Sequence, residues 1–355
     1  MQRVSARQIL TLSFLASLFT PAMTLADAVN TTVGTQDENR EKKVNEVVSS
    51  IIDNRGVLTS KGTFIFEPSF TYTHSSATVV AIEGFTVLPA LIIGLINISQ
   101  AERDIFNYAI TLRYGLTSRM EVSLKVPYID IDESIRERQA LDGTPVDIVS
   151  DTSGDGLGDV EMSVNYQLND GLNGWPFFIA NLRVKSDTGT SIFDLDRRQL
   201  VNDDGDVLGV IFDEQPTGSG FWAYQPGLTV LYPTDPAVIY GSISYLWNEK
   251  DDKGAEFGGE IKPGDIFGFS FGIGFSVNER TSFSLGYEHN VIDKTEVEFA
   301  PDLEDASFDR YHSGSLLLGI SQQTRGRNLL NLSLAVGVTE QSPDVQLTFK
   351  MPFQF

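Results

Sequence analysis

The feature that most constrains this chain is a strict alternation of apolar side chains with small or polar ones. Within residues 265–277 every second position from 267 onward is apolar and the positions between them are glycine or serine: Phe267, Phe269, Phe271, Ile273, Phe275 and Val277. Residues 344–355 repeat the pattern with another apolar set: Val345, Leu347, Phe349, Met351, Phe353 and Phe355. Successive side chains of a strand point to opposite faces, so each stretch predicts a long strand with one continuous hydrocarbon face.

The same two-residue period recurs from residue 61 to the end of the chain. It predicts twelve strands, near residues 61–74, 103–115, 119–132, 158–169, 175–187, 219–232, 237–249, 264–277, 281–295, 309–323, 327–340 and 344–355. Short connectors such as 116–118 alternate with long ones such as 75–102, 133–157 and 188–218. This layout is typical of bacterial outer-membrane barrels. We therefore expect an all-β fold, an antiparallel transmembrane β-barrel of about twelve strands over residues 61–355, located in the cell outer membrane.

A soluble β-sandwich or lipocalin-like barrel is the alternative fold. Strands of soluble proteins usually run about 5–6 residues, whereas the strands predicted here, at roughly 10–14 residues, suit a tilted membrane crossing. The mean hydropathy of −0.07 is too low for a helical membrane bundle. Tyrosine and tryptophan near the predicted strand ends indicate interfacial girdles: Tyr114, Tyr128, Trp175, Trp222, Tyr232 and Trp247.

Charge and cysteine content exclude several functional classes. The chain has 26 Lys and Arg against 48 Asp and Glu, a net charge of −22, which argues against a nucleic-acid partner because phosphate binding needs basic surface. The sequence contains no cysteine, which excludes a disulfide scaffold, a thiolate zinc site and a cysteine nucleophile.

The N-terminal residues 1–28 predict a secretory signal peptide. Arg3 and Arg7 precede an apolar run over 9–19, and Ala26-Asp27-Ala28 supplies small residues at a cleavage site before Val29. An anchor helix is the alternative, but the apolar run is shorter than the roughly 20 residues that span a bilayer. We therefore expect the chain to be exported.

Residues 29–60 predict a periplasmic helical segment. Apolar side chains of 36–54 follow helical spacing: Val44, Val47, Val48, Ile51 and Ile52. A short helix packed on its own domain, a plug in a barrel mouth and a coiled-coil contact are all compatible with this stripe.

The apolar segment 79–98 is long enough to suggest a membrane helix. Glu83, Gly84 and Pro89 interrupt it, and it lies between two predicted strands. We interpret it as strand ends and an apolar loop at the outer rim; a loop folded into the lumen and a lateral gate are the alternatives. Since exposed apolar patches usually mark a contact, this segment is also a candidate surface for an apolar ligand.

Charged side chains occur on the face of the predicted strands opposite to the hydrocarbon face. They are the candidates to line the barrel lumen: Arg113, Glu121, Lys125, Glu161, Arg183, Lys185, Glu288 and Lys350. Either they sort solutes by charge, or they pair with each other and close the lumen. Phe353 and Phe355, at the end of the alternating C-terminal strand, are the expected signal for the barrel-insertion machinery.

Evidence for metal or catalytic chemistry is weak. The acidic, glycine-rich run from Asp151 to Glu161 suggests a calcium loop, but Met162 stands where an EF-hand needs its glutamate, so a structural loop is favoured. His289 and His312 share the outward-facing parity of their strands and are expected to meet across the connector 296–308, with no serine beside His289 on that face. We expect no enzyme, no cofactor and no bound metal.

Several short motifs resemble the family of outer-membrane proteins labelled for the MetA pathway of phenol degradation. They are Tyr114-Gly115-Leu116-Thr117, Val126-Pro127-Tyr128, Gly156 to Glu161, and Ser284-Leu285-Gly286-Tyr287. The resemblance covers residues 61–355. It implies an outer-membrane barrel that moves small, often apolar, compounds, and it transfers no catalytic residue.

The functional hypothesis is passive passage of small molecules, apolar ones included, across the outer membrane. A barrel of about twelve strands lies between eight, whose interior side chains fill, and 16–18, which leave an open channel. The expected partners are outer-membrane lipid and lipopolysaccharide, the barrel-insertion machinery and small-molecule solutes. The alternative is a non-conducting structural or assembly-linked barrel, in which the helical segment and the 79–98 segment block the lumen.

Overall fold

The computed structural model describes residues 58–78, 98–141, 144–171, 174–201, 207–212, 214–234, 237–254, 259–278, 280–297, 306–307, 310–323 and 329–355. The expected signal peptide, the helical stripe of 36–54 and residues 79–97 of the apolar segment lie outside these ranges. Within the described ranges, none of the helical segments has the length and apolar character that a membrane crossing requires.

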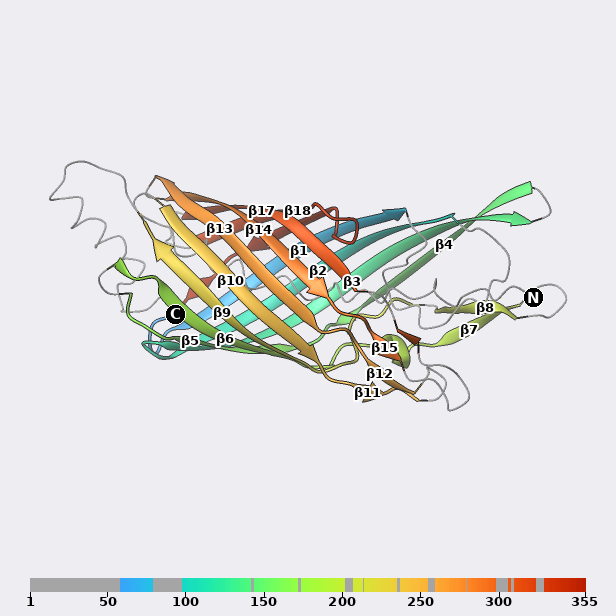
Figure 1. Ribbon diagram of the computed structural model, residues 1–355, viewed down its shortest axis with the longest axis horizontal. Coiled ribbons are helices and arrows are strands. Elements are labelled where there is room, and N and C mark those ends of the chain that lie inside the picture. Colours follow the sequence, from blue (N-terminus) through green and yellow to red (C-terminus); the bar gives the residue numbers. More distant parts are fainter. Residues whose placement is uncertain are drawn as a thin grey trace.

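A closed antiparallel barrel forms the body of the molecule (Figure 1). Its sheet contains fourteen strands in the described residues: β1 (Phe64–Thr78), β2 (Ile98–Thr117), β3 (Met120–Leu141), β4 (Thr144–Leu157), β5 (Glu161–Gln167), β6 (Phe177–Lys185), β9 (Ala223–Pro233), β10 (Ala237–Asn248), β13 (Ile266–Asn278), β14 (Thr281–Ile292), β17 (Tyr311–Gln323), β18 (Leu329–Gly337), β19 (Val345–Lys350) and β20 (Phe353–Gln354). β4 and β5 both pair with β3, and β19 and β20 both pair with β1. Each of these two sets of strands therefore occupies a single strand position in the barrel wall, which we call a stave. Fourteen strands less two leaves twelve staves within the described residues. Pairing of β1 with β19, Thr71 opposite Thr348, closes the barrel.

The twelve strands expected from the alternation are confirmed, with shifted ends. The expectation of a long loop over 133–157 is wrong, because β3 continues to Leu141 and β4 pairs with it along the whole length of β4. Figure 1 shows this hairpin extending beyond the other staves. A strand outside the bilayer has no hydrocarbon face, so the apolar alternation that identifies the other strands is absent from this hairpin.

Each stave presents one apolar face outward and one polar face inward. Phe271 is 55% exposed and its neighbour Ser270 only 6%. Large apolar side chains are exposed around the whole wall, and the buried class contains many polar and charged side chains. A soluble protein would have the reverse arrangement, so the outer surface is suited to lipid.

The two ends of the barrel differ. Short turns join β2 to β3 and β13 to β14, and the C-terminal Phe355 lies at the same end. The other end carries the β3–β4 hairpin, the hairpin of β7 (Arg197–Val201) and β8 (Val207–Phe212), and a small sheet. The small sheet consists of β11 (Asp251–Asp252), β12 (Glu260–Lys262), β15 (Glu296–Val297) and β16 (Ala306–Ser307). Long loops of outer-membrane barrels face the cell exterior, so the short-turn end is periplasmic.

Candidate channel interior

The inward faces of the staves form two unlike walls. β10, β13, β14 and β17 carry mostly small side chains on the face opposite to the exposed one: Ser242, Ser244, Gly268, Ser270, Gly272, Gly274, Ser282, Ser284, Gly286, Ser313 and Ser315. β1, β2, β3, β5 and β6 instead carry long charged side chains joined in ion pairs. We call these the small-residue wall and the charged wall.

Glu161 is the centre of the charged wall. Its Oε1 lies 3.4 Å from Lys125 Nζ and its Oε2 lies 3.2 Å from Arg183 Nη1. The glutamate side chain is 6% exposed, and the lysine and arginine side chains are 16% and 11% exposed. Two cations around one carboxylate give this cluster a net positive charge.

Glu288 is the charged residue of the small-residue wall. It lies opposite Ser270 of β13 and Ser315 of β17 in the strand register, and it is 6% exposed. Asn290 Nδ2 donates a 3.1 Å hydrogen bond to Glu288 Oε1. The small-residue wall thus contributes one buried carboxyl group, and the charged wall contributes the ion-pair cluster around Glu161.

Tyr240 occupies the inner surface of the small-residue wall near its periplasmic end. A Cβ atom at either Gly272 or Gly286 would collide with the Tyr240 ring. The glycines therefore let the ring lie against the wall, where it packs with Phe177, Ile179 and Leu231 in an apolar cluster.

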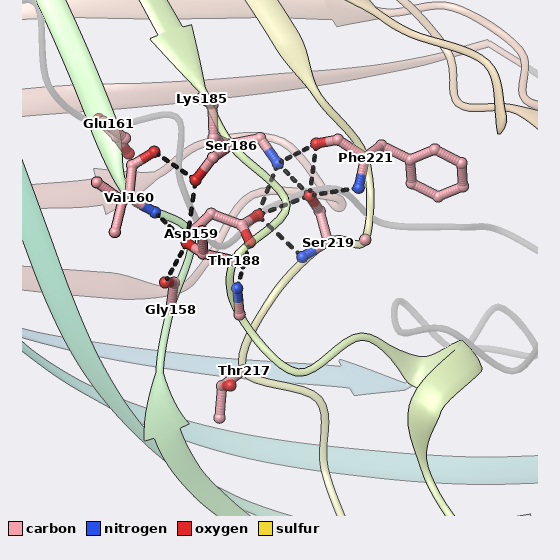
Figure 2. A network of polar contacts seen from close by, with 12 residues as sticks. Gly158, Asp159, Val160, Glu161, Lys185, Ser186, Thr188, Thr217, Ser219 and Phe221 are labelled. Carbon is pink, nitrogen blue, oxygen red and sulfur yellow. Dashed lines mark hydrogen bonds and ion pairs between the residues drawn. The ribbon is translucent and has the colours of Figure 1, made fainter.

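A second buried network lies where β4 passes into β5 (Figure 2). Lys185 Nζ donates to Asp159 Oδ2 at 2.8 Å, and also to Ser219 Oγ and the Phe221 carbonyl. Asp159 further accepts hydrogen bonds from the backbone N–H groups of Gly189 (3.1 Å) and Ser219 (2.9 Å). The carboxylate thus ties the β6 end to both ends of the connector 186–222.

The same connector completes the barrel wall on the cell-exterior side of this network. β6 pairs with β5 only as far as Lys185, so β4 has no strand partner on that side within the described residues. Segments of the connector take the place of a strand. The Ser186 N–H donates to the Val160 carbonyl at 2.9 Å, and Thr217 Oγ1 donates to the Leu157 carbonyl at 2.8 Å.

The remaining residues expected in the lumen occupy similar inward positions. Arg113 pairs with Glu67, which sequence reasoning did not select. Glu121 is 4% exposed and accepts hydrogen bonds from Thr59 and Asn165. Lys350 lies between Ser69 and Asn331 in the register. Whether these side chains line a solute path stays a prediction.

The two phenylalanines of the expected assembly signal lie at the barrel seam. Phe353 pairs with Phe66 of β1. The Phe355 N–H donates to the Phe64 carbonyl at 2.8 Å, and the Phe355 ring is exposed. Recognition of these residues by the insertion machinery stays a prediction.

A rim of outward-facing polar contacts marks the cell-exterior edge of the apolar band. Tyr72 OH donates to Asp104 at 2.7 Å and Tyr245 OH to Asp265 at 2.9 Å. His289 Nε2 and His312 Nδ1 lie 3.2 Å apart, which confirms the expected pairing of these histidines.

Just beyond the end of β14, Asp293 belongs to the same rim. The Lys294 N–H hydrogen bond and the Arg310 guanidinium lower the pKa of Asp293. In the described part of the chain, no group of three or more histidine, aspartate or glutamate side chains is arranged to hold a metal.

No protein-family model matches the chain, so its resemblance to the MetA-pathway family stays a prediction. Among solved structures, the COG4313 outer membrane channel from Pseudomonas putida F1 aligns with 84% of this chain and 97% of its own, at 16% identity and a TM-score of 0.51. The translocator domain of the autotransporter NalP from Neisseria meningitidis covers 94% and 96% at 7% identity and a TM-score of 0.44. The P. putida toluene transporter TodX covers 83% and 90% at 10% identity and a TM-score of 0.39.

The first of these likenesses shows the fold of the chain. Together with the closed barrel of twelve staves and its apolar outer band, it identifies an outer-membrane β-barrel.

Proposed function

We propose that the protein is a channel for passive passage of small molecules across the outer membrane. The observation that carries this proposal is the contrast between the two inner walls. The diameter of a barrel is set by its strand number, and about eight strands already give an interior that side chains can fill. Twelve staves enclose a wider interior than eight, and much of the small-residue wall contributes only glycine and serine side chains to fill it.

The composition of the interior suggests which class of solute passes through the barrel. Apolar clusters lie inside the barrel toward both ends, with Leu246, Ile266 and Ile292 at the outer end and Phe177 and Leu231 at the periplasmic end. In the strand register the charged cluster lies level with the outer apolar cluster, because Glu161 is opposite Lys185 and Lys185 is opposite Ala223, a member of that cluster. Small amphiphilic molecules, with an apolar body and one polar group, match an interior that combines apolar clusters with a charged one.

The rival function, a non-conducting structural barrel, is supported by the ion pairs. Lys125 and Arg183 both bind Glu161, and such pairs could fill the interior instead of facing water. The two functions differ in one measurable property, which is permeability of the folded barrel.

The test is reconstitution of the refolded mature protein in planar bilayers and in vesicles. The channel hypothesis expects discrete conductance steps, and faster vesicle entry of benzyl alcohol and small sugars than in protein-free vesicles. The same protein, boiled before reconstitution, provides the control for leakage by unfolded protein. Intact, heat-modifiable protein that neither conducts nor admits any solute would refute the channel.

A further inference from the structure

The chain segment before β1, Leu58 to Ser60, lies inside the barrel at its periplasmic end. Thr59 is 9% exposed and Leu58 is partly buried. These residues precede a strand that could have been reached along the outer edge of the barrel, so their burial needs specific contacts. Three sets of contacts, on different staves, hold them.

Glu121 of β3 holds the middle of the segment. Its Oε2 accepts hydrogen bonds from the Thr59 N–H, at 2.9 Å, and from Thr59 Oγ1. Its Oε1 accepts a 3.1 Å hydrogen bond from Asn165 Nδ2 of β5. Both oxygens of a carboxylate that is 4% exposed are therefore occupied, which anchors the segment because a buried carboxylate without donors is costly.

Gly115 of β2 gives the segment room to enter. A Cβ atom there would lie 2.6 Å from the Ser60 carbonyl carbon, so a side chain at this position is incompatible with the path. The Gly62 N–H donates to the Gly115 carbonyl at 2.8 Å, and the Gly115 N–H donates to the Thr63 carbonyl at 3.1 Å. This fixes the point at which the chain passes from β1 toward the interior.

Leu58 carries the segment to a distant part of the wall. It packs against the apolar cluster of Phe177, Ile179, Leu231 and Tyr240, which belong to β6, β9 and β10. Around the barrel, β3, β5, β6 and β9 separate β2 from β10. Gly62 is hydrogen-bonded to β2, and Leu58, four residues earlier, contacts this cluster. The chain therefore crosses the interior instead of following the rim.

We propose that Leu58, Thr59 and Ser60 form a strap across the periplasmic mouth that narrows the solute path, with Glu121 as its holding residue. This inference rests on the proposed channel function. The strap occupies cross-section that the small-residue wall would otherwise leave open. Solutes that leave the charged cluster must pass between the strap and the opposite wall.

The first experiment is a graded series of single-channel recordings. Glu121→Ala removes both acceptors, Glu121→Gln keeps one carbonyl acceptor, and Leu58→Ala removes the apolar contact while Leu58→Ile preserves it. We expect larger unitary conductance for Glu121→Ala and Leu58→Ala, a smaller gain for Glu121→Gln and no change for Leu58→Ile. A conducting wild type whose conductance is the same in all four variants would overturn the strap.

A second experiment reports the strap position without relying on conductance. The chain contains no cysteine, so an introduced pair is the whole thiol content. Leu58→Cys is combined with Ile179→Cys, which replaces an inward residue of β6 that is 5% exposed, or with Leu182→Cys, an outward residue of the same strand that is 45% exposed. Oxidation of folded protein, with a short bis-maleimide linker as the alternative reagent, should join Leu58→Cys to Ile179→Cys only.

The two experiments separate the strap from the channel. One outcome is cross-linking to the inward position, no conductance of the wild type and measurable conductance of Glu121→Ala. This outcome would show a strap that closes the periplasmic mouth. Cross-linking with every form silent would remove the channel and the narrowing role together. Equal cross-linking to Ile179→Cys and Leu182→Cys, or none to the inward position, would place the segment elsewhere and refute the strap.

Discussion

Lys185 and Asp159 form a buried ion pair, with Nζ and Oδ2 2.8 Å apart, at the point where β4 passes into β5. The lysine side chain is 1% exposed and the aspartate side chain 6%. Asp159 also accepts hydrogen bonds from Ser219 and Gly189 of the long connector, so the pair joins the barrel wall to the loop that completes it. The pair is thus a fixed structural element of the wall.

The Lys185–Asp159 pair predicts a large stability effect. Lys185→Met leaves Asp159 buried without its cation, and breaking a buried pair in this way costs roughly 3–5 kcal/mol. Urea unfolding in lipid vesicles, followed by tryptophan fluorescence, measures the loss. The double variant Lys185→Met with Asp159→Asn should recover part of it, because no unpaired charge remains. Strictly additive losses would show that the two side chains act independently.

The two faces of β13 predict unequal responses to the same substitution. Phe271 faces lipid, where an arginine near the midplane costs about 2–4 kcal/mol. Ser270 faces inward and lies opposite Glu288 in the register, so an arginine there gains an ionic partner. Phe271→Arg should therefore reduce the folded fraction, seen as heat-modifiable protein on gels, far more than Ser270→Arg. The reverse order would mean that the faces of this strand are misassigned.

Charged residues on the two walls predict opposite changes in ion selectivity. Under the channel hypothesis, Arg183→Gln removes a positive charge and should shift the reversal potential in a salt gradient toward cation preference. Glu288→Gln should shift it toward anion preference, because the opposite wall keeps its net positive cluster. Arg119→Gln is the matched control, since Arg119 pairs with Asp170 in exposed turns outside the lumen. Identical reversal potentials for all three variants would remove these residues from the solute path.

Two changes at the C-terminal residue, Phe355, distinguish the role of its aromatic ring in assembly from the role of its backbone hydrogen bonds. Deleting Phe355 removes the hydrogen bonds with Phe64 at the barrel seam as well as the aromatic ring. Phe355→Ala removes only the ring. If the ring is the insertion signal, both variants should accumulate as precursor in the periplasm, measured by membrane fractionation. Normal surface levels of Phe355→Ala with loss of the deletion variant would assign the role to the seam hydrogen bonds instead.

The sequence alone determined the barrel and the two faces of its staves. Period-two alternation is a local property, and the exposed position of Phe271 beside buried Ser270 follows directly from it. The pairing of His289 with His312 was also predictable, because parity and a short sequence separation place both on adjacent staves. The length of the β3–β4 hairpin was not, since outside lipid the strands need no apolar face.

Only the tertiary structure decided which charges meet and what crosses the interior. Parity placed Glu161, Lys125 and Arg183 on inward faces, but the register of three separate staves determined that they share one cluster. Asp159 stood out in the sequence as part of an acidic loop, whereas its partner Lys185 is known only from the fold. For residues 29–60 the sequence left a plug in the barrel mouth as one of three alternatives, and only the fold shows that Leu58 packs against the apolar cluster of β6, β9 and β10. These features depend on contacts between residues far apart in the chain, and their geometry exists only once the barrel has closed.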